Sequence, residues 1–200
     1  MASSPIQLRW RVVDGRIPLK ERHLRSLDPL QLPPPLTAWI RSRLEWAVDN
    51  LLAKDTDAVL CLAIDPEKDV VVSLEELRAL PKLTQRNLYE QDGFVTGVRI
   101  EGKPLEGIVF CESDGALFIS AEALASAAST LAYDLASTLG FAPVVAPLSA
   151  ECIKNTNTAF LVSDEFGFIP IDLGHHRPAE MPLSNKLKEC LDKVFRAVHS

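Results

Sequence analysis

The stretch LASTLGFAPVVAPLSAECIKNTNTAFLVSDEFGFIPIDLG, residues 135–174, decides the fold class of this 200-residue chain. It begins with the end of a helix, because Leu139 is followed by Gly140 and glycine commonly follows a helix C-terminus. Apolar runs bounded by turn residues then predict three strands and one short helix. The strands are expected at 141–147, 158–164 and 167–171, and the helix near 149–155. The strands at 158–164 and 167–171 are joined by a turn, and such antiparallel β segments with packed helices indicate an α+β fold.

The chain before and after this stretch carries further helix and strand signals. Alternating apolar residues at 6–13 end at Asp14-Gly15, which predicts a strand that runs into a tight turn. Apolar residues at three- and four-residue steps predict an amphipathic helix over 36–54. The other expected elements are a helix at 18–27, a β-hairpin at 57–65 and 69–73, strands at 93–100, 107–112 and 116–120, and a helix at 183–198.

Two further helices and one sheet are predicted from shorter signals. Ser73 and Glu76 match a capping box, which predicts a short helix that runs to about Leu80. The longest helix is expected over 120–139, where many alanines favour close packing against a sheet. The short β segments between 81 and 120 are interpreted as one small antiparallel sheet.

The domain organisation follows from length and from the distribution of these elements. We expect two small lobes of mostly antiparallel sheet with packed helices, residues 1–85 and 86–200, with a single domain as the alternative. Trp39 and Trp46 are expected in the core, and a contact surface is the alternative for them.

Composition and charge exclude several classes of protein. The net charge of −6 leaves no basic field for nucleic-acid binding, because such binding depends on clustered lysine and arginine. The sequence has no apolar run long enough for a membrane helix, and its first residues lack the pattern of a signal peptide. We therefore expect a cytoplasmic protein with neither nucleic-acid nor membrane partners.

Motifs for metal, redox and nucleotide chemistry are absent from the sequence pattern. The four cysteines are far apart and are expected to be reduced thiols. His175 and His176 are adjacent, so in an extended segment they would point in opposite directions and could not share one ion. His23 is expected at the surface or half-buried. Gly97–Lys103 has P-loop spacing, but the next residue is Pro104, which has neither an amide hydrogen nor a hydroxyl.

The order of elements in 135–174 resembles the C-terminal part of class IV, or fold-type IV, pyridoxal-phosphate (PLP) enzymes. This family includes branched-chain and D-amino-acid aminotransferases and aminodeoxychorismate lyase. The shared features are the Leu-Gly helix end, a β segment, a short helix, a β segment with small hydroxyl residues, and a proline-containing strand at Phe168–Ile171. Asp14-Gly15 followed by KERHLRSL, residues 20–27, is similar to the family's first strand, turn and histidine–arginine helix. The resemblance implies this fold and a homodimer.

The resemblance also implies roles for individual residues. Catalysis in the family needs a lysine that forms a Schiff base and a carboxylate that holds the pyridine nitrogen protonated. Lys82 is similar to that lysine, and Glu101, in the pair Glu101-Gly102, is similar to that glutamate. Arg25 and Ser163 are the candidates for binding the phosphate. An alternative register instead puts the segment from Glu106 to Phe110 on the strand between the lysine and the glutamate.

The sequence departs from the family pattern around the phosphate. The position that matches the family's phosphate-binding arginine is Ser26, and the expected hydroxyl turn reads Ser163-Asp164-Glu165, whose carboxylates would repel a phosphate dianion. The family's glycine-hydroxyl-arginine turn is replaced by ALASAAS at 123–129. We therefore interpret the chain as a class IV aminotransferase-like protein with a degenerate PLP site, a non-catalytic binding or interaction module without cofactor. The alternative is an active PLP-dependent aminotransferase or aminodeoxychorismate-type lyase acting on a small amino acid.

Overall fold

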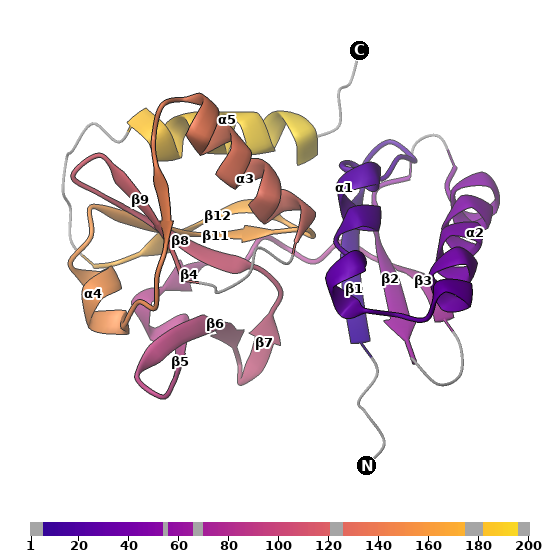
Figure 1. Cartoon of the computed structure of the whole chain (residues 1–200), viewed down its shortest axis with the longest axis horizontal. Helices are drawn as coiled ribbons and strands as arrows, with labels where there is room; N and C mark the ends of the chain where they lie inside the picture. The colour runs from indigo at the N-terminus through magenta and orange to yellow at the C-terminus, as the bar shows by residue number, and fades with distance from the viewer. Residues whose placement is uncertain (1–5, 54–55, 66–69, 121–125, 175–181, 196–200) are drawn as a thin grey trace. The chain divides into compact units, whose positions relative to one another are not determined.

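The computed structural model describes residues 6–53, 56–65, 70–120, 126–174 and 182–195 (Figure 1). The chain divides into two compact units. Unit 1 contains Met1–Ala79 and Val194–Ser200, and unit 2 contains Leu80–Lys193. The division between residues 79 and 80 falls in a segment, residues 76–82, that has neither helix nor strand. No helix among the described residues is long and apolar enough to cross a membrane.

Unit 1 is a three-stranded antiparallel sheet with helices on one face. Its strands, in spatial order, are β1 (Ile6–Val12), β2 (Ala58–Ile64) and β3 (Val70–Glu75). Its helices are α1 (Lys20–Arg25), the 3₁₀ helix η1 (Asp28–Leu30) and α2 (Pro34–Leu51). Alternate residues of the strands share one buried cluster with both α-helices, which is the pattern of a sheet with one covered face. The cluster includes Trp10, Val12, Leu24, Leu27, Ile40, Leu44, Leu60 and Leu62.

Helix α2 confirms the amphipathic pattern over 36–54. Ile40, Leu44 and Ala47 are buried along one side, at the four- and three-residue steps that one helix face requires. The helix starts with Pro34 and Pro35, which are suited to its first turn because amide hydrogens there have no intrahelical acceptor. The sequence signal therefore gives both the helix and its buried face.

Unit 2 is built on a six-stranded mixed sheet. The order of its strands is β10 (Pro143–Val145), β9 (Ala116–Ile119), β8 (Ile108–Ser113), β11 (Thr158–Ser163), β12 (Gly167–Asp172) and β4 (Leu83–Thr84). The outermost pairs, β10 with β9 and β12 with β4, are parallel, and the pairs between them are antiparallel. A second sheet contains β5 (Leu88–Gln91), β6 (Phe94–Ile100) and β7 (Lys103–Leu105), and the 3₁₀ helix η2 (Gln85–Asn87) precedes it.

Both faces of the larger sheet are covered, because nearly every residue of β8 and β11 is buried. Figure 1 shows α3 (Ala127–Thr138) and α5 (Pro182–Phe195) on one side of this sheet, with the β5–β7 sheet on the other. On the second side, Val98 and Leu105 share a core with Leu161 and with Ile153 of α4 (Ala150–Lys154). The mixed helices and sheets confirm the α+β fold.

The short helix predicted from Ser73 to Leu80 is wrong. Ser73 lies in β3, where it pairs with Cys61 of β2, and the segment after Glu75 is not helical. The backbone of Ser73 forms its hydrogen bonds in the β2–β3 ladder, so tertiary pairing overrides the local capping-box signal.

The single antiparallel sheet predicted between 81 and 120 is also wrong. Strand β6 pairs with β5 and β7, whereas β8 and β9 belong to the larger sheet. The helix predicted over 120–139 is shorter at its start, since α3 begins at Ala127 after a capping box formed by Ser126 and Ser129. Residues 121–125 lie outside the described ranges, as do the residues after 195 in the predicted last helix. Within the described ranges α2, not α3, is the longest helix.

Two predictions about single side chains need correction. His23 is fully buried, and its ring stacks on that of Trp10 at a centroid distance of 4.5 Å. Trp39 and Trp46, expected in the core, are 43% and 48% exposed on α2. Their positions flank the buried side of the helix instead of lying on it.

Candidate functional site

Buried polar groups of unit 2 gather where β11, the residues before β8 and the start of α3 meet. Ser163 ends β11, and Asp164 and Glu165 follow it in the turn to β12, all three at most 5% exposed. Val162 of β11 pairs with Ile108 of β8, and the same register, extended by two residues, places Asp164 opposite Glu106. Burial of such groups is unfavourable unless hydrogen bonds compensate, so their partners define what the site can do.

Asp164 binds the N-terminus of α3. Its Oδ1 accepts a hydrogen bond from the amide of Ala128 at 2.7 Å, and its Oδ2 accepts one from the amide of Ala127 at 3.3 Å. The next amide, of Ser129, donates to Oγ of Ser126 at 3.1 Å. The first amides of the helix are therefore used by the chain's own side chains. A carboxylate here is also stabilised by the positive end of the helix dipole.

Glu106 supports this turn from the other side. Its Oε2 accepts a hydrogen bond from Ser163 Oγ at 2.7 Å and another from the amide of Asp164 at 2.9 Å. Ser163 Oγ in turn accepts from the amides of Glu165 and Phe166 at 3.1 and 3.3 Å. Burial and, to a lesser extent, the neighbouring charge of Asp164 raise the pKa of Glu106 to about 8, although the hydrogen bonds from Ser163 and from the amide of Asp164 act in the opposite direction. The carboxyl of Glu106 is therefore mostly protonated at neutral pH.

Gly107 lets Glu106 approach β11. Its φ is +140°, and a Cβ at this position would lie 2.7 Å from the carbonyl oxygen of Val162 and 2.9 Å from Cγ of Leu161. Only glycine avoids this contact with the backbone of β11. The pair Glu106-Gly107 is thus a positioning element for the Ser163–Glu165 turn.

Carboxylates also bind the starts of the other two α-helices of unit 2. Glu90 accepts a hydrogen bond from the amide of Ala150 in α4 at 2.6 Å, and buried Glu112 accepts one from the amide of Ser184 in α5 at 3.0 Å. Each of the three α-helices described in this unit thus receives an acidic side chain from elsewhere in the chain at its start. Asp164 on α3 follows the same arrangement.

The residues proposed from the sequence are not brought into one cluster. Lys82 is exposed just before β4, at the edge of the larger sheet, and Glu101 is exposed in the β6–β7 turn with a φ of +50°. Neither forms a hydrogen bond or ion pair with another described residue. Arg25 is exposed on α1 of unit 1. Ser163 is the one proposed residue inside the buried cluster, where its hydroxyl contacts Glu106.

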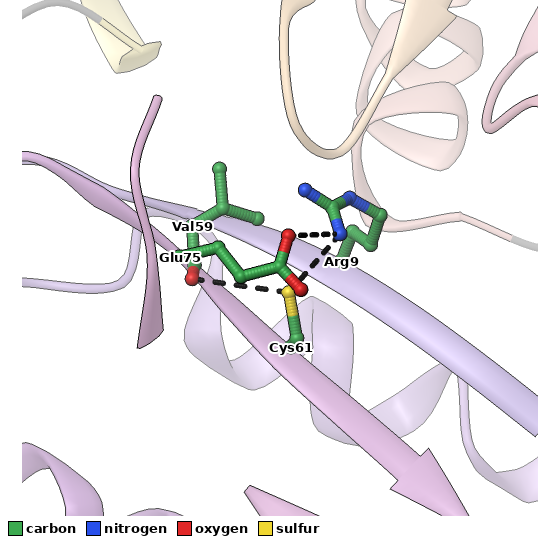
Figure 2. A network of polar contacts seen from close by, with 4 residues as sticks. All are labelled: Arg9, Val59, Cys61 and Glu75. Atoms are coloured by element: carbon green, nitrogen blue, oxygen red, sulfur yellow. Dashed lines mark hydrogen bonds and ion pairs between the residues drawn. The ribbon is translucent and has the colours of Figure 1, made fainter. Parts of the chain in front are cut away.

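A second polar network lies on the sheet of unit 1 and connects its strands. Figure 2 shows the side chain of Arg9 beside those of Glu75 and Cys61. Nη1 of Arg9 donates a hydrogen bond to Oε2 of Glu75 at 2.7 Å and one to Sγ of Cys61 at 3.2 Å. The hydrogen bond from Arg9 lowers the pKa of Glu75, with a smaller contribution from Cys61. Arg9 and Cys61 are directly opposite on β1 and β2, so the network joins all three strands. The ion pair between Arg9 and Glu75 therefore spans β2, from β1 to β3.

The buried cluster does not fit the phosphate of PLP. A phosphate needs hydrogen-bond donors and positive charge, which helix N-termini and arginine or lysine supply. Here the donors at the start of α3 already bind Asp164, and the titratable side chains in the hydrogen bonds given above, all between described residues, are those of Asp164 and Glu106, both acidic. No group of three or more metal-ligating residues in the described ranges could hold a metal ion. His175 and His176 lie outside those ranges.

Sequence reasoning missed the two residues that organise this cluster. It matched the acidic turn Asp164-Glu165 to the family's hydroxyl turn but did not predict that Asp164 would bind a helix start far away in the sequence. Glu106 was considered only as part of a strand. A Glu-Gly pair directly before the fully apolar run Ile108–Cys111 is the local signal that could have identified it.

The fold is shared with solved structures of aminotransferases and of a lyase. The chain is similar to 4-amino-4-deoxychorismate lyase from Pseudomonas aeruginosa, with a TM-score of 0.65 and 18% identity over 95% of this chain and 90% of that one. It is similar to a hypothetical aminotransferase from Mycobacterium tuberculosis in its PLP-bound form, with a TM-score of 0.64 and 14% identity over 96% and 89% of the two chains. The branched-chain amino acid aminotransferase from Escherichia coli gives a TM-score of 0.65 and 12% identity over 96% and 85%.

These similarities confirm the fold expected from the sequence. No protein-family model matches the chain, and no curated protein matches it. At identities this low, the shared property is the arrangement of helices and strands.

Proposed function

We propose that this chain, which has the fold of the class IV aminotransferases, is a non-catalytic binding or interaction module that does not hold PLP. The observation that carries the proposal is the contact between Asp164 and the first amides of α3. The chain's own carboxylate takes the hydrogen bonds that a helix N-terminus would otherwise offer to a phosphate. A phosphate could bind there only by displacing a buried acidic side chain.

The charge around Asp164 supports the same conclusion. Asp164 and Glu165 are buried in the turn, and the carboxyl of Glu106 is hydrogen-bonded to the backbone of Asp164. The raised pKa of Glu106 reflects how strongly this environment disfavours another negative charge. A phosphate dianion would meet the same burial and the same repulsion, so its binding would be unfavourable.

The positions of Lys82 and Glu101 add a second line of support. A Schiff-base lysine and a carboxylate at the ring nitrogen must contact the same cofactor. Lys82 is exposed before β4, whereas Glu101 is exposed in the turn of a hairpin in the other sheet of unit 2. Both are exposed, whereas catalytic groups are commonly activated by burial and by close charged partners.

The alternative is an active PLP-dependent aminotransferase or aminodeoxychorismate-type lyase, with Lys82 as the Schiff-base lysine. The observation in its favour is the fold shared with PLP-bound enzymes. A homodimer, which the resemblance implies, belongs to either function and stays a prediction that sedimentation of the purified chain would check.

Exposure to PLP separates the two functions. The full chain is mixed with excess PLP, treated with borohydride in one half of the sample, desalted, and analysed by absorption and by mass spectrometry. We expect a colourless protein whose Lys82 carries no more cofactor than the exposed control Lys103. A yellow desalted protein with PLP fixed selectively on Lys82, and loss of the colour in Lys82→Ala, would refute the proposal.

A further inference from the structure

One side of α2 presents two tryptophans to solvent with an arginine between them. Trp39, Arg43 and Trp46 follow each other at steps of four and three residues, so they lie along one flank of the helix, and we call them the Trp–Arg–Trp stripe. Trp39 and Trp46 are 43% and 48% exposed. Large aromatic side chains left exposed in a row are unusual on a monomeric surface and mark contact sites.

The stripe is held in place by the helix that carries it. Ile40, Leu44 and Ala47 bury the neighbouring side of α2 in the core of unit 1, which fixes the rotation of the helix. Nδ2 of Asn50 donates a hydrogen bond to the carbonyl oxygen of Trp46 at 2.8 Å. The tryptophans are therefore presented by a rigid element, so a partner loses little conformational entropy when it binds them.

Arg43 gives the stripe its charge. Its guanidinium lies 4.5 Å from the centroid of the Trp39 ring. Its Nε is buried without a hydrogen-bond partner among the described residues, and neither Glu45 nor Asp49, the two carboxylates of α2, forms an ion pair with it. With Nε buried, the N–H groups of the two terminal nitrogens are the ones with which a guanidinium stacked on an aromatic ring can bind a carboxylate.

We propose that the Trp–Arg–Trp stripe docks another protein through a segment that places one carboxylate between two apolar side chains. The apolar side chains would pack on Trp39 and Trp46, and the carboxylate would bind Arg43. This pattern of apolar, negative, apolar is the complement of apolar, positive, apolar on α2. The inference stands on α2 alone and does not depend on whether unit 2 binds PLP.

A second copy of this chain is a poorer occupant of the stripe. If two stripes met around a two-fold axis, Trp39 of each copy would face Trp46 of the other, and the two Arg43 side chains would face each other at the centre. Like charges at the centre of a contact disfavour it. The complementary partner is therefore a different chain with an acidic centre.

A phage-displayed library of 16-residue peptides tests the proposal on the full chain. Peptides are selected on the wild-type protein and counter-selected on the double variant Trp39→Ala/Trp46→Ala, which changes exposed side chains only. We expect enriched peptides with an aspartate or glutamate between two apolar residues. Binding of the best peptide should fall roughly 30-fold in each single tryptophan variant, the loss typical of a hot-spot residue.

Arg41 is the control for a test of the charge of Arg43. Arg41 is exposed on the same helix but on the opposite flank. Arg43→Gln should weaken the peptide about tenfold, because a charge-assisted hydrogen bond is lost, and Arg41→Gln should leave it unchanged. Thermal unfolding of each variant checks that the fold is intact.

Three results would overturn the proposal. The first is enrichment of basic or uncharged peptides, or of none that distinguishes the wild type from the double variant. The second is an equal effect of Arg43→Gln and Arg41→Gln on an enriched peptide. The third is a wild-type dimer in sedimentation that the double variant abolishes, since a second copy would then cover the stripe.

Discussion

Replacing Asp164 with asparagine tests the contact that closes the start of α3. The substitution keeps the shape of the side chain but removes its charge. In the wild type, Asp164 accepts hydrogen bonds from the amides of both Ala127 and Ala128. Asparagine has one acceptor oxygen, so its amide group would turn a donor toward one of these two N–H groups.

The expected loss combines a charge-assisted hydrogen bond with the interaction between a carboxylate and the helix dipole. These effects together destabilise the start of α3 by about 2 kcal/mol. Relief of the repulsion between Asp164 and Glu106 would offset part of this only above the pKa of Glu106, because Glu106 is mostly neutral below about 8. The measurement therefore belongs at neutral pH.

Amide hydrogen exchange measured by NMR is the suitable assay. All three tryptophans of the chain lie in unit 1, so tryptophan fluorescence would not report on α3. We expect exchange at Ala127 and Ala128 to become roughly 30-fold faster in Asp164→Asn, which corresponds to about 2 kcal/mol. The control is Asp92→Asn, in the exposed β5–β6 turn, where asparagine also tolerates the observed φ of +53°.

Equal exchange in Asp164→Asn and Asp92→Asn would refute the reasoning. It would mean that Asp164 contributes nothing to the helix start beyond its general charge. The proposal that Asp164 occupies a phosphate position would then lose its main support.

Three further predictions follow from the same contacts. Because the pKa of Glu106 is raised in the fold, the folded chain holds a proton between about pH 4.5 and 8 that the unfolded chain releases. The free energy of unfolding should therefore fall as pH rises through this window. Glu106→Gln should flatten this pH dependence, as measured by urea unfolding followed by circular dichroism. A pH dependence that survives in the variant would contradict the assignment. Gly107→Ala should destabilise the chain by more than about 2 kcal/mol in the same assay. The control Gly115→Ala should destabilise it by about 1 kcal/mol, because Gly115 also has a positive φ but a Cβ there would have no atom within 4 Å. Equal losses would show that the close approach of Gly107 to β11 is unimportant. Burial raises the pKa of Cys111 to about 12, so iodoacetamide should modify exposed Cys152 in the native protein and Cys111 only after unfolding, as mass spectrometry would detect; equal modification rates would contradict the buried position of Cys111.

The elements with strong local patterns could be predicted from the sequence. The periodicity over 36–54 gave α2 together with its buried residues Ile40 and Leu44. The alternating run at 6–13 and the turn residues Asp14-Gly15 gave β1 and its end. In both cases the buried residues recur every two to four positions, so a short stretch of sequence is enough to predict the element.

The arrangement of the sheets could not be predicted in the same way. Strand β8 pairs with β11, so that Ile108 lies opposite Val162, and such a pairing depends on partners distant in sequence. The same limitation explains the wrong helix at Ser73, where the ladder with Cys61 outweighed a local capping pattern. Local signals compete with tertiary pairing, and here the pairing prevailed.

The candidate site shows the same division between local and distant information. The acidic turn Asp164-Glu165 was visible in the sequence as a poor neighbour for phosphate. Its contact with the amides of Ala127 and Ala128 joins residues 36 and 37 positions apart, so no local pattern could indicate it. The role of Glu106 required both the register of β8 against β11 and the close approach at Gly107.

The most direct test of the central claim is an NMR titration that follows the amide resonances of Ala127 and Ala128 while PLP is added to the full, isotope-labelled chain. If Asp164 holds the start of α3 against phosphate, both resonances should stay in place in excess PLP. Saturable shifts of these two resonances would show that PLP displaces Asp164 and would contradict the account.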